Sequence, residues 1–373
     1  MDKICQAADD LDKLGYAVIR GVYSNEEAEK IHSDMWSCLE KATEGKLHRD
    51  LDYTKKKAMD LLPHQHGIIH SYRINHAPPI RQVRRDPRIL NIFASFYGTD
   101  QLTSSMDRIN FKFPGKVYES RKPWPHVDQD PRLLGRVSIQ SYLSLTDSGE
   151  NAPGNRLYQG SHLVFDTFFK DRRLEKGPVD NWVTLSDEEA TKLEKTCPLV
   201  KPVLGKGDML FWDSRTVHSP SDGSNFKEGR FVIYLCYNRL WEKSNDQTFL
   251  NKKREAFLRC SASRHTPIPQ SLFPKGPRIY DSSKPPSYAE FTKEQLGIED
   301  EPIGAEKYLF GFSSYKGREG LNLGEGWNKG REKPLLDFVS PFTNLINKQP
   351  VVEEKKSRKG GDLLHSKTKK SKL

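Results

Sequence analysis

Residues 207–237 read GDMLFWDSRTVHSPSDGSNFKEGRFVIYLCY, and this stretch carries the strongest signal of the fold class. Two runs rich in aromatic and β-branched residues, 208–212 and 231–237, stand on either side of a polar turn region. Such residues favour strands, and Gly, Pro, Asp and Asn favour the turns between them. We therefore expect two strands that lie side by side, with His218 and Arg230 at the two ends of the turn.

Similar short runs occur at 109–113 and 136–145, and Tyr16–Arg20 also has the composition of a strand. Short strands with frequent turns, and without regularly alternating helices, favour an antiparallel sandwich or barrel. A capping box at Ser24–Glu27 followed by apolar residues at spacings of three and four predicts a helix over 25–43. A second helix is expected over 87–97, and a charged helical insertion over 160–200.

The composition indicates a folded body with polar loops and at least one disordered stretch, because apolar residues are 35% and charged residues 29% of the 373. No apolar run is long enough to span a membrane, and the N-terminus does not read as a secretory signal. Five scattered cysteines predict reduced, intracellular thiols rather than a disulfide frame. These cysteines are Cys5, Cys38, Cys197, Cys236 and Cys260.

Half of the net charge of +10 lies in residues 351–373, which contain eight Lys/Arg and three acids. The remaining body is only mildly basic, so nucleic-acid binding by the folded domain is not favoured. The last three residues, Ser371-Lys372-Leu373, match a peroxisomal import signal. We therefore expect a peroxisomal location with an import receptor as partner, or a cytoplasmic location if the signal is not read.

Residues 124–128 contain a His-x-Asp motif, His126 and Asp128. In an extended segment residues i and i+2 point to the same side, so the imidazole and the carboxylate can converge on one cation. Non-haem iron(II) oxygenases need one further histidine to complete a facial triad. His218, in the turn after the run 208–212, is the candidate third ligand.

Two other motifs compete for a metal. His48-Arg49-Asp50 is a second His-x-Asp, but it stands in a polar stretch with no strand pattern, and we interpret it as a surface coincidence. His64-Gln65-His66 lacks a carboxylate or cysteine at ligand spacing, so a polar loop or lid is the preferred interpretation. Arg230 favours the first motif, because a guanidinium at a strand end near the metal can hold the distal carboxylate of 2-oxoglutarate in a bidentate pair.

With these residues in place, the chain resembles the phytanoyl-CoA dioxygenase (PhyH-like) family of iron(II)- and 2-oxoglutarate-dependent oxygenases. The resemblance covers about residues 10–240 and rests on the order of several blocks besides the ligands. These blocks are Leu14–Val22, Asn110–Gly115, Tyr142–Asp147, Gly160–His162 and Gly207–Asp213.

The resemblance implies a mainly β fold with flanking helices around a double-stranded β-helix, a cupin-like jelly roll. It implies that Lys112 and Tyr142, with Arg230, bind 2-oxoglutarate, and that His162 is a structural residue. We expect a dioxygenase domain over 1–315, with the β-helix core over about 100–240 and a helical, Pro-rich extension over 241–315. Residues 316–373 are expected to be a disordered tail.

The function implied is hydroxylation of a small organic or lipid-type substrate, with O2 consumed and succinate and CO2 released. The cofactors implied are Fe(II) and 2-oxoglutarate, with ascorbate as an optional reductant. Retention of Asp128 favours hydroxylation over halogenation. Residues 148–159 depart from the family pattern, so substrate identity is not carried over. The alternatives are a catalytically silent jelly-roll binding protein and an oxygenase acting on nucleic acid or protein.

Overall fold

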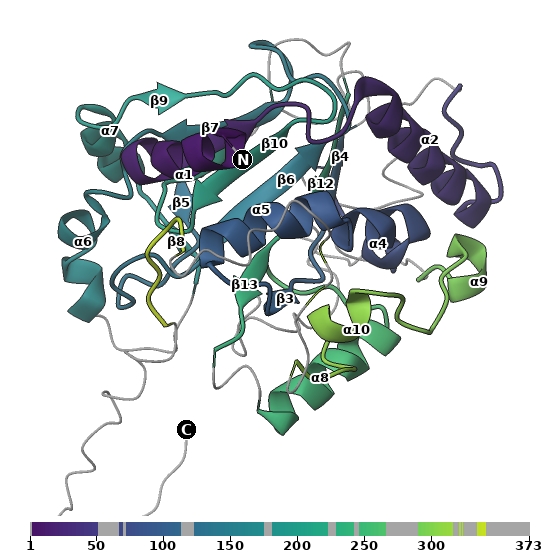
Figure 1. Ribbon diagram of the computed structural model, residues 1–373. Helices are drawn as coiled ribbons and strands as arrows, with labels where there is room; N and C mark the ends of the chain where they lie inside the picture. Colours follow the sequence, from purple (N-terminus) through teal and green to yellow (C-terminus); the bar gives the residue numbers. More distant parts are fainter. Residues whose placement is uncertain are drawn as a thin grey trace, which may run out of the picture.

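The computed structural model describes residues 2–50, 67–69, 72–112, 123–174, 181–222, 229–241, 246–265, 290–315, 321, 323 and 334–340 (Figure 1). Its strands are β1 (Tyr16–Ile19), β2 (Ile68–Ile69), β3 (Leu102–Ser104), β4 (Ile109–Lys112), β5 (His126–Val127), β6 (Ile139–Ser144), β7 (Gly154–Tyr158), β8 (Val183–Thr184), β9 (Leu199–Val200), β10 (Met209–Asp213), β11 (His218–Ser221), β12 (Arg230–Tyr234) and β13 (Tyr237–Arg239).

Its helices are α1 (Asp2–Leu14), α2 (Asn25–Ala42), η1 (Ile74–His76), α4 (Pro78–Arg84), α5 (Pro87–Tyr97), α6 (Phe165–Phe168), η2 (Asp171–Leu174), α7 (Asp187–Glu194), α8 (Gln247–Leu258), α9 (Lys293–Leu296) and α10 (Glu306–Leu309). No helix of the described residues is both long and apolar enough to cross a membrane. In the described part of the expected insertion, residues 160–174 and 181–200, the helices are the short α6, η2 and α7, with short strands beside them.

The strands form two antiparallel sheets. The large sheet has the order β1-β10-β6-β12-β4-β2, with β13 paired to both β3 and β6, and the small sheet has the order β8-β5-β11-β7-β9. Consecutive strands change sheet, because β10 and β12 belong to the large sheet and β11 to the small one. This is the connectivity of a double-stranded β-helix, and the core is an open pair of sheets rather than a closed barrel.

The expectation that the two runs in 207–237 would lie side by side is therefore wrong. Strand β6 separates β10 from β12 in the large sheet, and β11 pairs with β5 and β7. The alternation of apolar residues shows which face of a strand is buried, but it does not encode which strand lies next to it. The polar region between β10 and β12 therefore contains β11, a strand of the small sheet.

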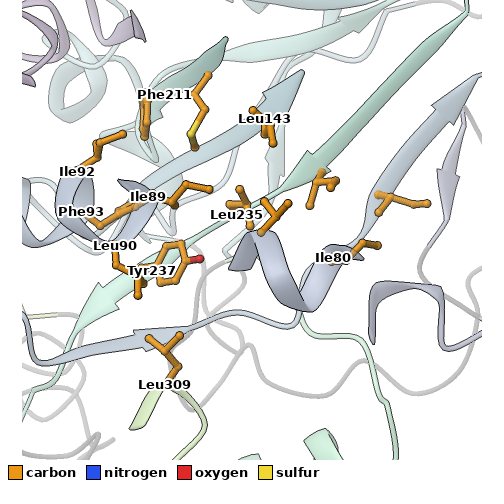
Figure 2. Packing of buried hydrophobic residues seen from close by; sticks show 14 of the residues in the cluster. Ile80, Ile89, Leu90, Ile92, Phe93, Leu143, Phe211, Leu235, Tyr237 and Leu309 are labelled. Atoms are coloured by element: carbon orange, nitrogen blue, oxygen red, sulfur yellow. The ribbon is translucent and has the colours of Figure 1, made fainter. Parts of the chain in front are cut away.

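The outward face of the large sheet carries the main apolar core. Phe231 and Ile233 point to this face of β12, because alternate residues of a strand share a face. Helix α5 packs Phe93 and Phe96 against Phe211 of β10, at ring-centroid distances of 5.7 and 5.6 Å. Figure 2 shows Phe93 of α5 beside the strands of the sheet. Truncation of one such aromatic to Ala typically costs about 3–5 kcal/mol.

The opposite face of the large sheet is more polar and looks toward the small sheet. Arg230 and Tyr234 share this face of β12, and Tyr142 of β6 is the cross-strand partner of Tyr234. Leu157 from β7 of the small sheet packs with Trp212 of β10 here. The space between the two sheets is therefore lined by groups that can bind polar ligands.

The turn between α1 and β1 supports the segment that leads to His218. Gly15 has φ +82°, and a Cβ added there would lie 2.5 Å from both His162 Nδ1 and Thr216 Oγ1, so only glycine fits. The Gly15 carbonyl accepts hydrogen bonds from the Asp213 amide at 3.0 Å and from Thr216 Oγ1 at 2.8 Å. The structural role expected for His162 agrees with its place beside this turn, where Nε2 contacts the Asp12 carbonyl at 3.0 Å.

Two helix predictions are confirmed. The Ser24 capping box begins α2, and Asp86 caps α5, which starts at Pro87. Helices α1 and α4 were not predicted.

Part of the expected tail is packed against the folded body, so that expectation is wrong for residues 321, 323 and 334–340. Leu321, Leu323 and Leu336 are buried in the main core. Phe338 lies 4.2 Å from Tyr97 between ring centroids, and the Val339 amide donates to Arg136 O at 2.9 Å. Burial of apolar side chains outweighs the Gly- and Lys-rich composition around them. Residues 341–373 lie outside the described residues.

Candidate metal centre

Two histidines meet because their strands pair in register. His126 of β5 and His218 of β11 are direct cross-strand partners, and their ring centroids are 4.3 Å apart. His126 Nδ1 lies 2.9 Å from the Trp124 carbonyl oxygen, and His218 Nδ1 lies 3.0 Å from that of Thr216. A carbonyl only accepts, so each Nδ1 carries the hydrogen and each Nε2 presents a lone pair when the ring is neutral.

The carboxylate joins them as the His-x-Asp spacing predicts. Asp128 follows β5, and its amide donates to the Ser214 carbonyl at 3.2 Å. Asp128 Oδ2 lies 3.2 Å from His218 Nε2 and 3.9 Å from His126 Nε2. Gln140 Nε2, from β6 of the large sheet, donates to the same Oδ2 at 3.0 Å. The potential ligand atoms of the three residues all lie within 4.8 Å of one another.

The protonation states favour metal binding. Burial, with help from the nearby His218, lowers the pKa of His126 to about 4 although Asp128 opposes the shift. Burial raises the pKa of Asp128, but the neighbouring His265, His126 and His218 outweigh this effect and hold that pKa well below its usual value. A neutral imidazole and an ionised carboxylate are the forms that coordinate a cation.

This donor set fits an iron(II) ion. Two imidazole nitrogens and one carboxylate oxygen are the ligands of a facial triad, which leaves coordination positions open for other ligands. In neutral form, the Nε2 lone pairs of His126 and His218 would face the negative Oδ2 of Asp128 at 3.9 and 3.2 Å. A divalent cation between these atoms removes that repulsion.

The residues expected to bind 2-oxoglutarate line the large-sheet side of the same space. The Arg230 guanidinium lies 4.9 Å from the Tyr142 ring centroid, and the phenol groups of Tyr142 and Tyr234 raise the pKa of Arg230 against the opposing effect of burial. Only 4% of Arg230 is exposed, and its Nε has no hydrogen-bond partner among the described residues. A buried cation with an unsatisfied donor is a binding group for a carboxylate.

Trp212 contacts both His218 and Tyr142, the neighbour of Arg230. Its ring lies 5.4 Å from the His218 ring and 5.9 Å from the Tyr142 ring, between centroids. Its indole Nε1 is buried without a hydrogen-bond partner within the described part of the chain. Two buried donors without acceptors among the described residues, Trp212 Nε1 and Arg230 Nε, therefore lie on the side of the site that leads from His218 to Arg230.

Lys112 stands directly opposite Arg230 in the β4–β12 pair and is 3% exposed. Its Nζ forms an ion pair with Asp222. Burial lowers the pKa of Lys112, and Asp222 opposes that shift. Lys112 is therefore beside Arg230, and its ammonium group is paired with the carboxylate of Asp222, which follows β11.

The competing motifs do not join this site. His48 lies in a partly exposed segment, with Nδ1 3.6 Å from Asp50 Oδ2 and Nε2 3.8 Å from Glu40 Oε1, but among the described residues these groups do not form a metal-ligand cluster. His64 and His66 lie outside the described residues.

Sequence reasoning missed two residues that contact Asp128. Gln140 looks like any polar strand residue, and nothing in the sequence around it marks a contact with the carboxylate. His265 lies 3.2 Å from Asp128 Oδ1 through its Nε2, although it comes 137 positions later in a region read only as a variable extension. Neither residue is part of a motif, so only the fold reveals them.

Two imidazoles and a carboxylate between the sheets of a double-stranded β-helix define the class of non-haem iron oxygenases. The family model for phytanoyl-CoA dioxygenase (PhyH) matches residues 11–223, which is more than half of the chain. The chain belongs to this family. His218 falls inside the match, whereas Arg230 and His265 follow it.

The chain is similar to several known proteins. "Ava biosynthesis cluster protein O" of Aspergillus versicolor is 26% identical over 214 residues, covering 52% of this chain and 65% of that protein. The crystal structure of GlcNAc Inducible Gene 2 (DUF1479) from Candida albicans superposes with a TM-score of 0.53 at 14% identity, covering 84% of this chain and 77% of that chain. EctD from S. alaskensis, solved with 2-oxoglutarate and 5-hydroxyectoine, has a TM-score of 0.45 at 18% identity, covering 63% and 75%.

Proposed function

We propose that this protein is an iron(II)- and 2-oxoglutarate-dependent dioxygenase that hydroxylates a small organic or lipid-type substrate. The observation that carries the proposal is the cross-strand pair His126 and His218, whose Nε2 atoms face the ionised Asp128. When bound, iron(II) and 2-oxoglutarate supply the oxidising chemistry, in which O2 is consumed, succinate and CO2 are released and the substrate gains a hydroxyl group.

The chain's own residues hold and orient these groups. His126, Asp128 and His218 would hold the metal, with both imidazoles fixed by backbone carbonyls. Arg230, with Tyr142 beside it, would bind the distal carboxylate of 2-oxoglutarate at the far side of Trp212. Lys112, which stands opposite Arg230 and is paired with Asp222, would also help to hold that carboxylate. Enclosure between the two sheets excludes water from this region.

The first test is turnover of 2-oxoglutarate by purified protein with iron, ascorbate and a panel of substrates. Wild-type protein is expected to release succinate, and His126→Ala and Asp128→Ala are expected to abolish both succinate release and iron binding. His48→Ala is the matched control, because it removes a histidine from the other His-x-Asp motif. Absence of succinate from wild-type protein with every substrate would support the catalytically silent alternative.

Asp128 also bears on the type of reaction. A carboxylate at this position occupies the coordination site that a halide would need, so transfer of a hydroxyl group is the favoured outcome. Mass spectrometry of the product under 18O2 is expected to show one labelled oxygen in the substrate and one in succinate. A product without labelled oxygen would contradict hydroxylation.

A peroxisomal address would favour an acyl-type substrate. The C-terminal Ser371-Lys372-Leu373 lies outside the described residues, so this part of the proposal rests on the sequence. The last 12 residues fused to a fluorescent protein are expected to direct it to peroxisomes. A diffuse cytoplasmic signal would remove the support for a peroxisomal acyl substrate and leave the metal centre unaffected.

A further inference from the structure

The space around Asp128 contains a third histidine that the metal triad does not use. His265 Nε2 lies 3.2 Å from Asp128 Oδ1, whereas His126 and His218 contact the other oxygen, Oδ2. Both His265 Nε2 and Asp128 Oδ1 are buried and have no hydrogen-bond partner among the described residues. Two unsatisfied polar atoms at this distance need only a small ring rotation to form a hydrogen bond.

The position of His265 is set by the backbone. The Met106 amide donates to Ser263 Oγ at 2.8 Å, and the Ser263 amide donates to the Met106 carbonyl at 2.9 Å. Asn75 Nδ2 donates to the carbonyls of Met106 at 3.0 Å and Ser261 at 3.2 Å. These bonds clamp the two segments together, and His265 stands two positions beyond Ser263.

The tautomer of His265 follows from its other neighbour. Arg108 Nη2 lies 3.4 Å from His265 Nδ1, and Arg108 itself is paired with Asp107 through Nε at 3.1 Å. A guanidinium only donates, so Nδ1 must be the accepting nitrogen and Nε2 must carry the hydrogen. The imidazole is thereby oriented to donate toward Asp128 Oδ1.

His265 is not placed as a fourth metal ligand. The cluster whose ligand atoms all lie within 4.8 Å of one another contains His126, Asp128 and His218 and does not extend to His265. Its Nε2 approaches the opposite carboxylate oxygen from the one that faces the two histidines. The geometry therefore separates the ligand side of Asp128 from the side that His265 contacts.

From this arrangement we infer that His265 is a positioning residue, which donates a hydrogen bond to the outer oxygen of Asp128 and directs Oδ2 toward the metal. The inference rests on the proposed function, and it extends the metal centre to a residue beyond the family match. Gln140 acts on the metal-facing oxygen and His265 on the outer one, so the carboxylate is oriented from both sides. Loss of such an outer contact typically weakens metal binding about 10- to 100-fold.

The test uses the full-length chain with cobalt(II) as the metal, in the absence of oxygen, and compares His265→Leu with His265→Gln. Glutamine keeps an N–H donor near the position of Nε2, whereas leucine has none. We expect cobalt affinity to fall about 10- to 100-fold in His265→Leu. In His265→Gln we expect it to stay close to wild type, with an unchanged visible cobalt spectrum.

His48→Leu is the matched control, because His48 also stands beside a carboxylate, Asp50, but away from the metal centre. Thermal denaturation without metal is expected to be alike for the His265 and His48 variants, so that a folding defect is recognised. Wild-type affinity in His265→Leu, or failure of glutamine to restore binding, would overturn the positioning role. A changed cobalt spectrum in His265→Gln would instead identify His265 as a ligand and also overturn it. If wild-type protein binds no metal, the proposed function fails and the inference falls with it.

Discussion

At the scale of single residues, the centre depends on how each side chain is held as well as on its identity. Each ligand histidine is fixed through Nδ1 by the carbonyl two residues before it, so the backbone itself selects the metal-binding nitrogen. Asp128 receives Gln140 on one oxygen and faces His265 with the other. The three proposed ligands could be named from the sequence because type and spacing carry the chemistry. Gln140 and His265 could not, because only the packing of distant segments brings them there.

Arg230 offers the sharpest test of 2-oxoglutarate binding at this scale. Arg230→Lys keeps the charge but loses the planar fork that binds a carboxylate bidentately. Hydrogen bonds to charged groups contribute about 1.5–3 kcal/mol, so we expect the KM for 2-oxoglutarate to rise about 10- to 100-fold. Metal affinity measured without 2-oxoglutarate is expected to be unchanged. An unaltered KM would mean that the carboxylate binds elsewhere.

At the scale of elements, local sequence signals predict where a helix or strand occurs better than they predict which strands lie next to one another. The α2 capping box and the Asp86-Pro87 start of α5 are encoded in a few adjacent residues, so both helices could be predicted. The pairing of β11 with β5 rather than with β12 could not, because sheet order depends on contacts between distant segments. Helix α4 was missed because it begins at Pro78, with Ala77 as its N-cap and no side-chain cap, at the end of a stretch with no clear period.

The packing of η1 against the end of α8 yields a pH-dependent prediction. His76 Nε2 lies 3.0 Å from the Ser261 carbonyl, and its ring packs edge-on to Phe257 at 5.5 Å between centroids. Burial, with the nearby Arg84, lowers the pKa of His76 to about 3. The unfolded chain, with a histidine pKa of about 6.5, therefore binds a proton that the folded chain does not between pH 6.5 and 3.

Because of His76, the free energy of unfolding decreases as the pH falls through this window, with a limiting slope of about 1.4 kcal/mol per pH unit. His76→Gln removes the titrating group and retains a donor for the Ser261 carbonyl. Urea unfolding at several pH values between 7 and 4.5 is expected to show a shallower decline in the variant. Parallel pH profiles for wild type and variant would show that His76 is not buried in neutral form.

At the scale of the whole molecule, segments far apart in the sequence close the fold around the sheets. Arg136, 5% exposed, pairs with Asp12 of α1 at 2.6 Å and with Asp213 of β10 at 2.7 Å. The guanidinium also lies 5.8 Å from the Phe338 ring centroid, in the segment 334–340. One side chain thereby contacts the N-terminal helix, the sheet and the C-terminal segment. Composition suggested a tail here, because the apolar residues that anchor it are few and separated by polar sequence.

A buried ion pair ties the extension after residue 290 to the helical layer. Arg81 of α4 contacts Glu306 of α10 at 2.6 Å, and the two side chains are 5% and 0% exposed. Arg81→Met leaves a buried carboxylate with Arg85 as a more distant partner at 3.5 Å. We expect a loss of about 3–5 kcal/mol in the free energy of unfolding, because an uncompensated buried charge is costly.

The double variant Arg81→Met/Glu306→Gln removes that charge as well, so it is expected to recover part of the loss. Chemical denaturation of the wild type, both single variants and the double variant completes the cycle. A double variant no more stable than Arg81→Met would show that the helices pack independently of this pair.

The central claim is that the space between the two sheets binds iron(II) and 2-oxoglutarate together, and anaerobic absorption spectroscopy tests it most directly. Iron(II) chelated by a 2-oxo acid develops a visible charge-transfer band. We predict that wild-type protein develops this band on addition of both components, that Asp128→Ala and His218→Ala do not, and that Arg230→Lys requires more 2-oxoglutarate to reach it. No band in wild-type protein, or an equal band in the Asp128→Ala and His218→Ala variants, would contradict the account.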